Sequence, residues 1–214
     1  MLGNENLAKY VLDRPVSKQP GSEFNYNSGC SQLLAEVIHK KTGNSLGFVK
    51  KHLLSPLGIS NYQWSMDMDG VINGLGGLEM TPRDMAKFGY LYLKGGYWEG
   101  QQIVPRAWVE ESTVGHIKIY GILAIISPYY GYQWYIHPLY FHSFGYQGQY
   151  IFVIPKHEMA VVFTSGLTYR QYSFIPHLIE HYIIPSAKET KPILKNSKAE
   201  ELLNSKIKKF NTGW

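Results

Sequence analysis

The first half of the chain carries apolar residues at the spacing of amphipathic helices. In SQLLAEVIHKKTG (31–43) they recur three and four positions apart, which is the period of one helix face. Gly43 follows a run of basic residues, and this arrangement is typical of a helix C-terminus. We therefore expect a helix here, with Cys30, the single cysteine, buried as a small apolar side chain.

The end of this run spells two catalytic motifs at once. Lys41-Thr42-Gly43 matches a Lys-Thr-Gly substrate box, and 43–47 matches the G-x-S-x-G nucleophile elbow. The elbow needs a strand before its serine and the box needs an exposed strand edge, whereas a helix is expected before both. We predict instead that Gly43 ends one helix and that Asn44 or Ser45 caps the next, over 46–54.

Two further helix starts are marked by proline. Thr81 is followed by Pro82 and then by Asp84, the pattern of a capping residue with proline in the first turn. This helix is expected to stop at Gly95-Gly96, and Pro105 is expected to open another.

The second half of the chain is rich in β-branched and aromatic residues, which favour strands. The predicted strands are YGYQWYI (130–136), GQYIFVIP (148–155) and MAVVFTS (159–165), and a helix over 173–183 should cover one face of their sheet. Helices followed by antiparallel strands and a closing helix predict an α+β fold, a mixed α/β layer arrangement.

Composition and charge narrow the class of protein. Hydrophobic residues make up 44% and charged residues 17%, as in a globular protein. Residues 187–214 hold seven Lys and three Glu, a net of +4, so the rest carries only +1 of the total +5. We interpret this tail as solvated, with nucleic acid or an anionic membrane as the alternative partners.

No run reaches the ~18 apolar residues of a membrane span, and the N-terminus lacks the pattern of a signal peptide. A cytoplasmic location is expected for the chain as it stands, and export if an upstream segment is missing.

A family resemblance becomes visible when several segments are read in order. The chain resembles the serine β-lactamase-like superfamily, which includes class C β-lactamases, DD-peptidases, esterases and 6-aminohexanoate-dimer hydrolases. The segments that carry it are PGSEFNYNSG (20–29), LLAEVIHKKTG (33–43), LLSPLGI (53–59), GGLEMTPRDMAKFGYLYLKGGYWEGQQIVPRAWV (76–109), YGYQWY (130–135), GYQGQYIFVIP (145–155) and MAVVFTSG (159–166).

The resemblance implies a β-lactamase/transpeptidase-like fold, an antiparallel sheet flanked by helices. Residues 1–185 would be the C-terminal portion of such a domain, incomplete on its N-terminal side, and 186–214 a charged extension. The family places a Ser-x-x-Lys box on a helix, a Tyr box in a loop, and a Lys-Thr-Gly or His-x-Gly box on a strand.

Tyr26-Asn27-Ser28 resembles the second box, with Ser28 where many members have Asn. By this resemblance Tyr26 assists proton transfer, because a phenol beside a protonated lysine can act as a general base. The alternative for Tyr26 is a core or turn tyrosine.

The third box aligns with Ser143-Phe144-Gly145, which has neither Lys nor His in its first position, although His142 is adjacent. Gly145 would let substrate approach the backbone, and the Tyr146 N–H would be an oxyanion donor. Without the usual cation we expect a small ester or amide substrate rather than a carboxylate. The alternative for His142 is a solvent-facing or satisfied strand histidine.

The first box has no counterpart in the expected place. The single Ser-x-x-Lys, 205–208, lies in the charged tail, and only 25 residues precede Tyr26. A missing N-terminal segment carrying Ser-x-x-Lys is therefore expected.

A metal or cofactor has little support. HLIEH (177–181) matches H-x-x-E-H of one zinc protease class, but a hydrophobic helix with surface histidines is the simpler interpretation, since no downstream glutamate ligand stands out. No nucleotide-binding glycine motif is present. We expect no cofactor and no metal.

The functional expectation is a serine hydrolase that carries out acyl transfer on a small ester, amide or β-lactam-like substrate, inactive as this chain alone. The alternatives are a non-catalytic module of the same fold that binds peptide-like or cell-wall ligands, and a fragment without a stable fold.

Overall fold

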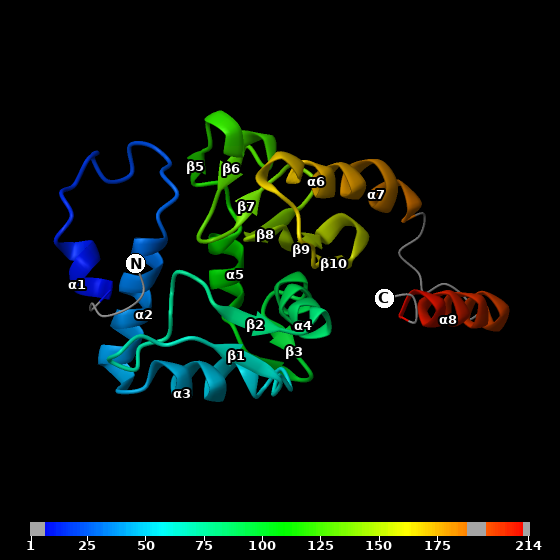
Figure 1. Cartoon of the computed structure of the whole chain (residues 1–214), viewed down its shortest axis with the longest axis horizontal. Coiled ribbons are helices and arrows are strands. Elements are labelled where there is room, and N and C mark those ends of the chain that lie inside the picture. The colour runs from blue at the N-terminus through cyan, green and yellow to red at the C-terminus, as the bar shows by residue number, and fades with distance from the viewer. Residues whose placement is uncertain (1–6, 188–195, 212–214) are drawn as a thin grey trace.

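The computed structural model describes residues 7–187 and 196–211 and has a six-stranded antiparallel sheet (Figure 1). The sheet order is β10-β9-β8-β7-β6-β5, so each strand pairs with the next one along the chain. The strands are β5 (Ile117–Lys118), β6 (Tyr129–Tyr130), β7 (Tyr135–Ile136), β8 (Phe141–Gly145), β9 (Gln149–Ile154) and β10 (Met159–Phe163). The predicted α+β class and antiparallel sheet are confirmed.

Helices cover both faces of this sheet. On one face Tyr150, Phe152 and Ile154 of β9 pack against Ile175 and Ile179. The last two belong to a continuous helical segment made of α6 (Phe174–Leu178), η5 (Ile179–Ile183) and α7 (Ile184–Ser186). The helix expected over 173–183 is therefore present and covers one face.

On the other face Val153 packs with Tyr92, Val109 and Trp134. These contacts bring in α4 (Pro82–Leu93) and α5 (Arg106–Ser112), whose predicted starts at Thr81 and Pro105 are confirmed. Alternate residues of β9 are buried on opposite faces, which explains why this strand is a continuous hydrophobic and aromatic run from Tyr150 to Ile154.

The elements from the N-terminus to β2 form the part of the molecule drawn in blue and cyan in Figure 1. They are α1 (Leu7–Leu12), α2 (Ser28–Thr42), α3 (Ser45–Val49), η1 (Lys50–Leu54), and the hairpin of β1 (Tyr62–Trp64) and β2 (Leu78–Met80). Further short elements are β3 (Tyr97–Trp98), β4 (Gln101–Gln102), η2 (Gly121–Ile125), η3 (Pro155–His157) and η4 (Tyr169–Gln171), and α8 (Ser197–Asn211) lies in the tail.

Residues 41–47, which match two catalytic motifs, have a structural role. Gly43 ends α2 in the left-handed conformation at φ 73°, and the Asn44 side chain accepts the Gly47 N–H as the cap of α3. Ser45 has no exposed surface, and its Oγ accepts the Ile72 N–H at 3.1 Å. A buried hydroxyl that bonds to a loop backbone cannot serve as an open nucleophile.

Two local expectations are corrected. The run 130–136 is not one strand, because a turn between β6 and β7 places Gln133 at φ 68°. Cys30 is exposed rather than buried. The reason is the orientation of α2, which buries Gln32 and Ala35 instead.

No helix in the described ranges is both long and apolar enough to cross a membrane.

Candidate active site

Tyr26 lies immediately before α2, and the cap of that helix fixes its position. Asn27 is extended at φ −140°, and its side chain accepts the Gly29 N–H at 2.8 Å. This bond satisfies one of the free donors at the helix start. The Tyr26 ring is half exposed, at 52%. Ser28 is the first residue of the helix and is half-buried.

The side chains of this loop face the sheet at β6 and β7. The Phe24 ring lies 4.9 Å from the Tyr130 ring. The pKa of Tyr130 is raised to about 12, first by burial and then by repulsion from the Tyr26 phenolate. Burial, with further repulsion from Tyr130 and Tyr26, also raises the pKa of Tyr135. Tyr26 is therefore bordered by two phenols that stay neutral across the physiological range.

Tyr135 connects this phenol cluster to the strand that carries the predicted third box. In the β7–β8 pairing Tyr135 lies opposite His142, and its ring contacts Phe144 at 6.2 Å edge-on. Ser143 and Gly145 belong to the same strand, β8. Tyr135 thus lies between the Tyr26 loop and residues His142 and Phe144 of β8. The side chain of Ser143 points to the other face of that strand, because successive strand side chains alternate.

The turn after Gly145 holds a backbone N–H that no described residue accepts. The Gly148 N–H donates to the Gly145 carbonyl at 3.1 Å, and the Gln147 N–H donates to the Tyr172 hydroxyl at 3.3 Å. Among the described residues the Tyr146 N–H has no hydrogen-bond partner. Its side chain is 83% exposed. A free N–H on a fixed turn is what an oxyanion donor requires.

Gln133 is a site residue that the sequence did not reveal. Its Nε2 donates to Ser31 Oγ of α2 at 3.0 Å, and its Oε1 accepts the Tyr130 hydroxyl at 3.3 Å. One side chain thus ties the helix that follows Tyr26 to the strand pair that borders it. The left-handed φ of Gln133 costs backbone energy that these bonds offset.

His142 lies inside the sheet layer and not on an open face. It has no exposed surface, and its ring stacks on Tyr135 at 5.3 Å and on Phe152 at 4.9 Å. Burial lowers its pKa to about 3, although the backbone of Ser143 and Ile126 favours the charged form. The expectation that His142 contacts substrate, or faces solvent, is corrected by this burial.

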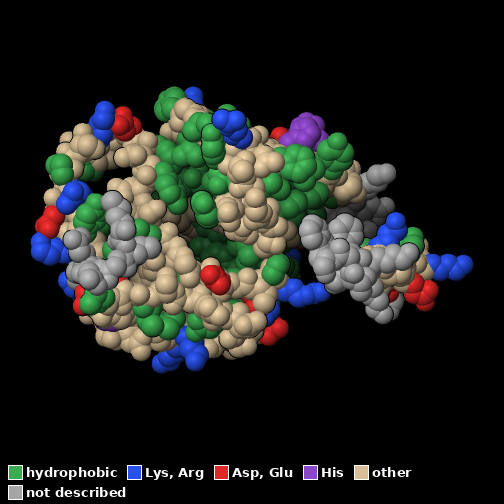
Figure 2. All heavy atoms as spheres, in the orientation of Figure 1, with side chains coloured by type: hydrophobic (Ala, Val, Ile, Leu, Met, Phe, Trp, Pro, Cys, Tyr) green, Lys and Arg blue, Asp and Glu red, His purple; other side chains and the backbone are tan. Residues whose placement is uncertain are grey.

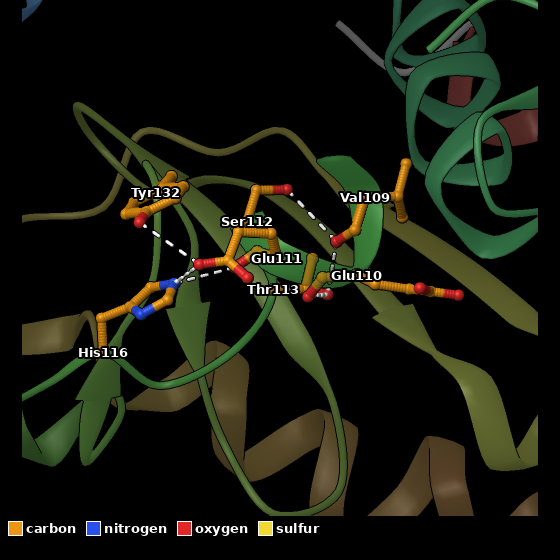
Figure 3. Close-up of polar contacts among 7 residues, drawn as sticks. All are labelled: Val109, Glu110, Glu111, Ser112, Thr113, His116 and Tyr132. Atoms are coloured by element: carbon orange, nitrogen blue, oxygen red, sulfur yellow. Dashed lines mark hydrogen bonds and ion pairs between the residues drawn. The ribbon is translucent and has the colours of Figure 1, made fainter. Parts of the chain in front are cut away.

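Outside this region, an acid–histidine–tyrosine cluster lies at the end of α5 (Figure 3). Glu111 accepts the Tyr132 hydroxyl at 3.4 Å, and His116 Nε2 lies 2.8 Å from the Glu111 carbonyl. The adjacent Ser112 is buried and turns its hydroxyl back to the Val109 carbonyl, as Figure 3 shows. The histidine does not reach the serine, so this cluster is not a catalytic triad.

The zinc alternative is not supported. Glu180 accepts the Tyr140 hydroxyl at 2.7 Å, while His177 and His181 stack on each other at 4.1 Å. Within the residues that the structure describes there is no group of three or more potential metal ligands. Ser205 is exposed on α8, and the side chain of Lys208 lies outside the described residues.

Comparison with known proteins points to one family. A profile of the Beta-lactamase family matches residues 2–176. A 6-aminohexanoate-dimer hydrolase of Paenarthrobacter ureafaciens is 30% identical over 104 residues, which are 44% of this chain and 24% of that protein.

Solved structures share the fold of this chain. A Bacillus anthracis protein assigned as a 6-aminohexanoate-dimer hydrolase is 26% identical, with a TM-score of 0.70, over 85% of this chain and 48% of its own. A beta-lactamase from Mycobacterium bovis is 17% identical, with a TM-score of 0.65, over 80% and 67% of the two chains. The chain spans about half the length, or less, of both 6-aminohexanoate-dimer hydrolase relatives.

Proposed function

Because this chain belongs to the Beta-lactamase family, we propose that it supplies the tyrosine and oxyanion side of a serine acyl-transfer site. The substrate class is a small ester or amide. The observation that supports the proposal is the contact of the Tyr26 loop with β6, through the rings of Phe24 and Tyr130. It is joined by the turn after β8, where the Tyr146 N–H has no hydrogen-bond partner among the described residues.

The reaction follows from the roles of these groups. A serine hydroxyl attacks the carbonyl carbon of the ester or amide, and a lysine–tyrosine pair that includes Tyr26 takes its proton. The Tyr146 N–H donates to the carbonyl oxygen as it becomes negative. The proton passes to the leaving alcohol or amine, and water then releases the acyl group and restores the serine. Ser28 and Ser143 would contact the substrate or the lysine.

The serine and lysine of this scheme are proposed to come from a further segment. No Ser-x-x-Lys occurs before Tyr26 in this sequence, and the relatives extend well beyond the matched part. Position 143 holds a serine where the family has a cationic residue. This favours a substrate that has no carboxylate at the point where it would meet residue 143.

The test compares the chain alone with the chain expressed together with the genomic segment that precedes Met1. We expect no hydrolysis of p-nitrophenyl acetate by the chain alone. The longer protein should hydrolyse it, and Tyr26→Phe should lower kcat by at least about 100-fold, the usual size of a lost acid–base group.

Tyr97→Phe is the matched control, because Tyr97 is an exposed tyrosine of β3 outside the site. Hydrolysis by the chain alone that disappears in Tyr26→Phe would contradict the need for a further segment. An upstream segment without Ser-x-x-Lys would contradict the source of the nucleophile.

A non-catalytic binding module is the second candidate, favoured by the lack of Ser-x-x-Lys before the sheet. It would bind peptide-like or cell-wall ligands at the candidate active site. Binding of such a ligand by the longer protein, without labelling by a fluorescent fluorophosphonate, would support it over the enzyme.

A further inference from the structure

A pocket of about 790 Å³ lies between α1, the loop 13–25 and the start of α2. In Figure 1 this loop arches away from the two helices, at the end of the molecule drawn in blue. The volume lies within the range of pockets that hold small molecules. Its apolar lining is Leu7, Tyr10, Val11, Pro15, Val16, Pro20, Cys30 and Leu75.

The pocket and the candidate active site lie on opposite sides of one stretch of chain. Glu23, Asn25 and Asn27 line the pocket. Phe24 and Tyr26, between them, face Tyr130 on the sheet. Alternation of this kind is the property of an extended backbone. A ligand in the pocket would therefore not occupy the substrate side of Tyr26.

Arg14 is a cation of the pocket that contacts with Tyr10 hold in place. Arg14 Nε donates to the Tyr10 carbonyl at 3.3 Å, and the guanidinium carbon lies 4.4 Å from the centre of the Tyr10 ring. Among the described residues Arg14 forms no ion pair. By contrast, Lys18 pairs with Glu23 at 3.4 Å. The terminal nitrogens of Arg14 are thus available, and a guanidinium binds a carboxylate through two parallel hydrogen bonds.

We propose that this pocket binds a small amphipathic carboxylate. The carboxylate pairs with Arg14, and an apolar chain of several carbons lies along Val11, Val16 and Leu75. The amides of Asn25 and Asn27 give further polar contacts within the pocket wall. This site is separate from the acyl-transfer groups and does not depend on the chain being catalytic.

Cys30 provides a direct readout, because it is the single cysteine of the chain, is exposed, and lines the pocket. The experiment measures the rate at which iodoacetamide, a neutral reagent, alkylates this thiol. Hexanoate at about 20 mM, a concentration that detects millimolar dissociation constants, should slow alkylation at least threefold. Hexanamide, its neutral counterpart, should slow it by less than half of that effect.

Arg14→Met keeps an apolar stem and removes the charge, so it should abolish the difference between the two ligands. Arg83→Met, at an exposed arginine of α4 outside the pocket, should behave as the original protein. Circular dichroism verifies that each variant is folded.

Three results in folded protein would overturn the proposal: no slowing by hexanoate, equal slowing by hexanamide, or full protection retained in Arg14→Met. None of them bears on p-nitrophenyl acetate hydrolysis, so failure here is distinguishable from failure of the proposed function.

Discussion

At the scale of single residues, His142 gives the protein a defined sensitivity to acid. The unfolded chain binds a proton near pH 6.5, whereas the folded chain holds a neutral imidazole down to about pH 3. The proton therefore stabilises the unfolded state, and stability is lost as pH falls through this window. We expect a loss of about 3 kcal/mol between pH 6.5 and pH 4 from this residue alone, at about 1.4 kcal/mol per pH unit.

Urea unfolding at pH 7 and pH 4 measures this effect, with His142→Phe as the comparison. Phenylalanine fits the aromatic surroundings and cannot bind a proton, so the variant should lose less stability on acidification. Burial also lowers the pKa of His137, and the charge of Glu180 partly opposes this shift. His137 is present in both proteins, so the comparison isolates the proton that His142 binds together with its coupling to His137. Equal losses in the two proteins would mean that His142 can be protonated in the folded state.

The sequence identified Tyr26 as a site candidate but not the residues that hold its surroundings. Tyr26 is identified by its immediate neighbours, a loop followed by a helix cap. Gln133 acts through Ser31, which is 102 positions away in the sequence. Its backbone is left-handed, a conformation that a sequence usually signals with glycine, and this position has none. Contacts of such separation depend on the folded topology, and local propensity does not encode them.

At the scale of elements, Gly89 sets how closely α4 approaches the sheet. A Cβ at this position would lie 2.7 Å from Ile151 Cγ2 and 3.3 Å from Ala160 Cβ. Gly89→Ala should raise helix propensity by about 1 kcal/mol but overpack the interface by about 1–3 kcal/mol. We expect net destabilisation of about 1 kcal/mol, measured as a lower urea midpoint.

Gly166→Ala is the matched control, because its added Cβ meets no atom within 4 Å. It should leave the midpoint nearly unchanged. If Gly89→Ala were instead stabilising, α4 could shift on the sheet at little cost.

The helix and strand order follows from local signals such as Thr81-Pro82, Gly43 and the apolar run of β9. The buried face of α2 does not. Leu34 and Val37 looked like its core positions, but they are 59% and 54% exposed. Which face a helix buries depends on the elements packed against it. The periodicity of apolar residues predicts that the helix has a buried face but does not determine which residues form it.

At the scale of the whole molecule, β10 is one of the two edge strands of the six-stranded sheet in the described part of the chain. Its residues, Met159–Phe163, are all apolar and half-buried, with neither proline nor charge to protect the edge. We expect alternate β10 amides to exchange with deuterium at least about 100-fold faster than those of β9, which is paired on both sides. Hydrogen exchange followed by nuclear magnetic resonance measures this difference. Uniform protection along β10 would show that the edge is covered in solution.

Side chains alternate along residues 23–27, so the pocket wall and the surface that faces the sheet are built from the same stretch of chain. A single inserted or deleted residue before Phe24 would exchange the orientations of its neighbours, moving amides toward the phenols and aromatic rings toward Arg14. Substitutions can alter either surface alone, but a change in chain length here damages both together. We therefore expect changes in the length of this stretch to perturb both surfaces, even though it belongs to a loop.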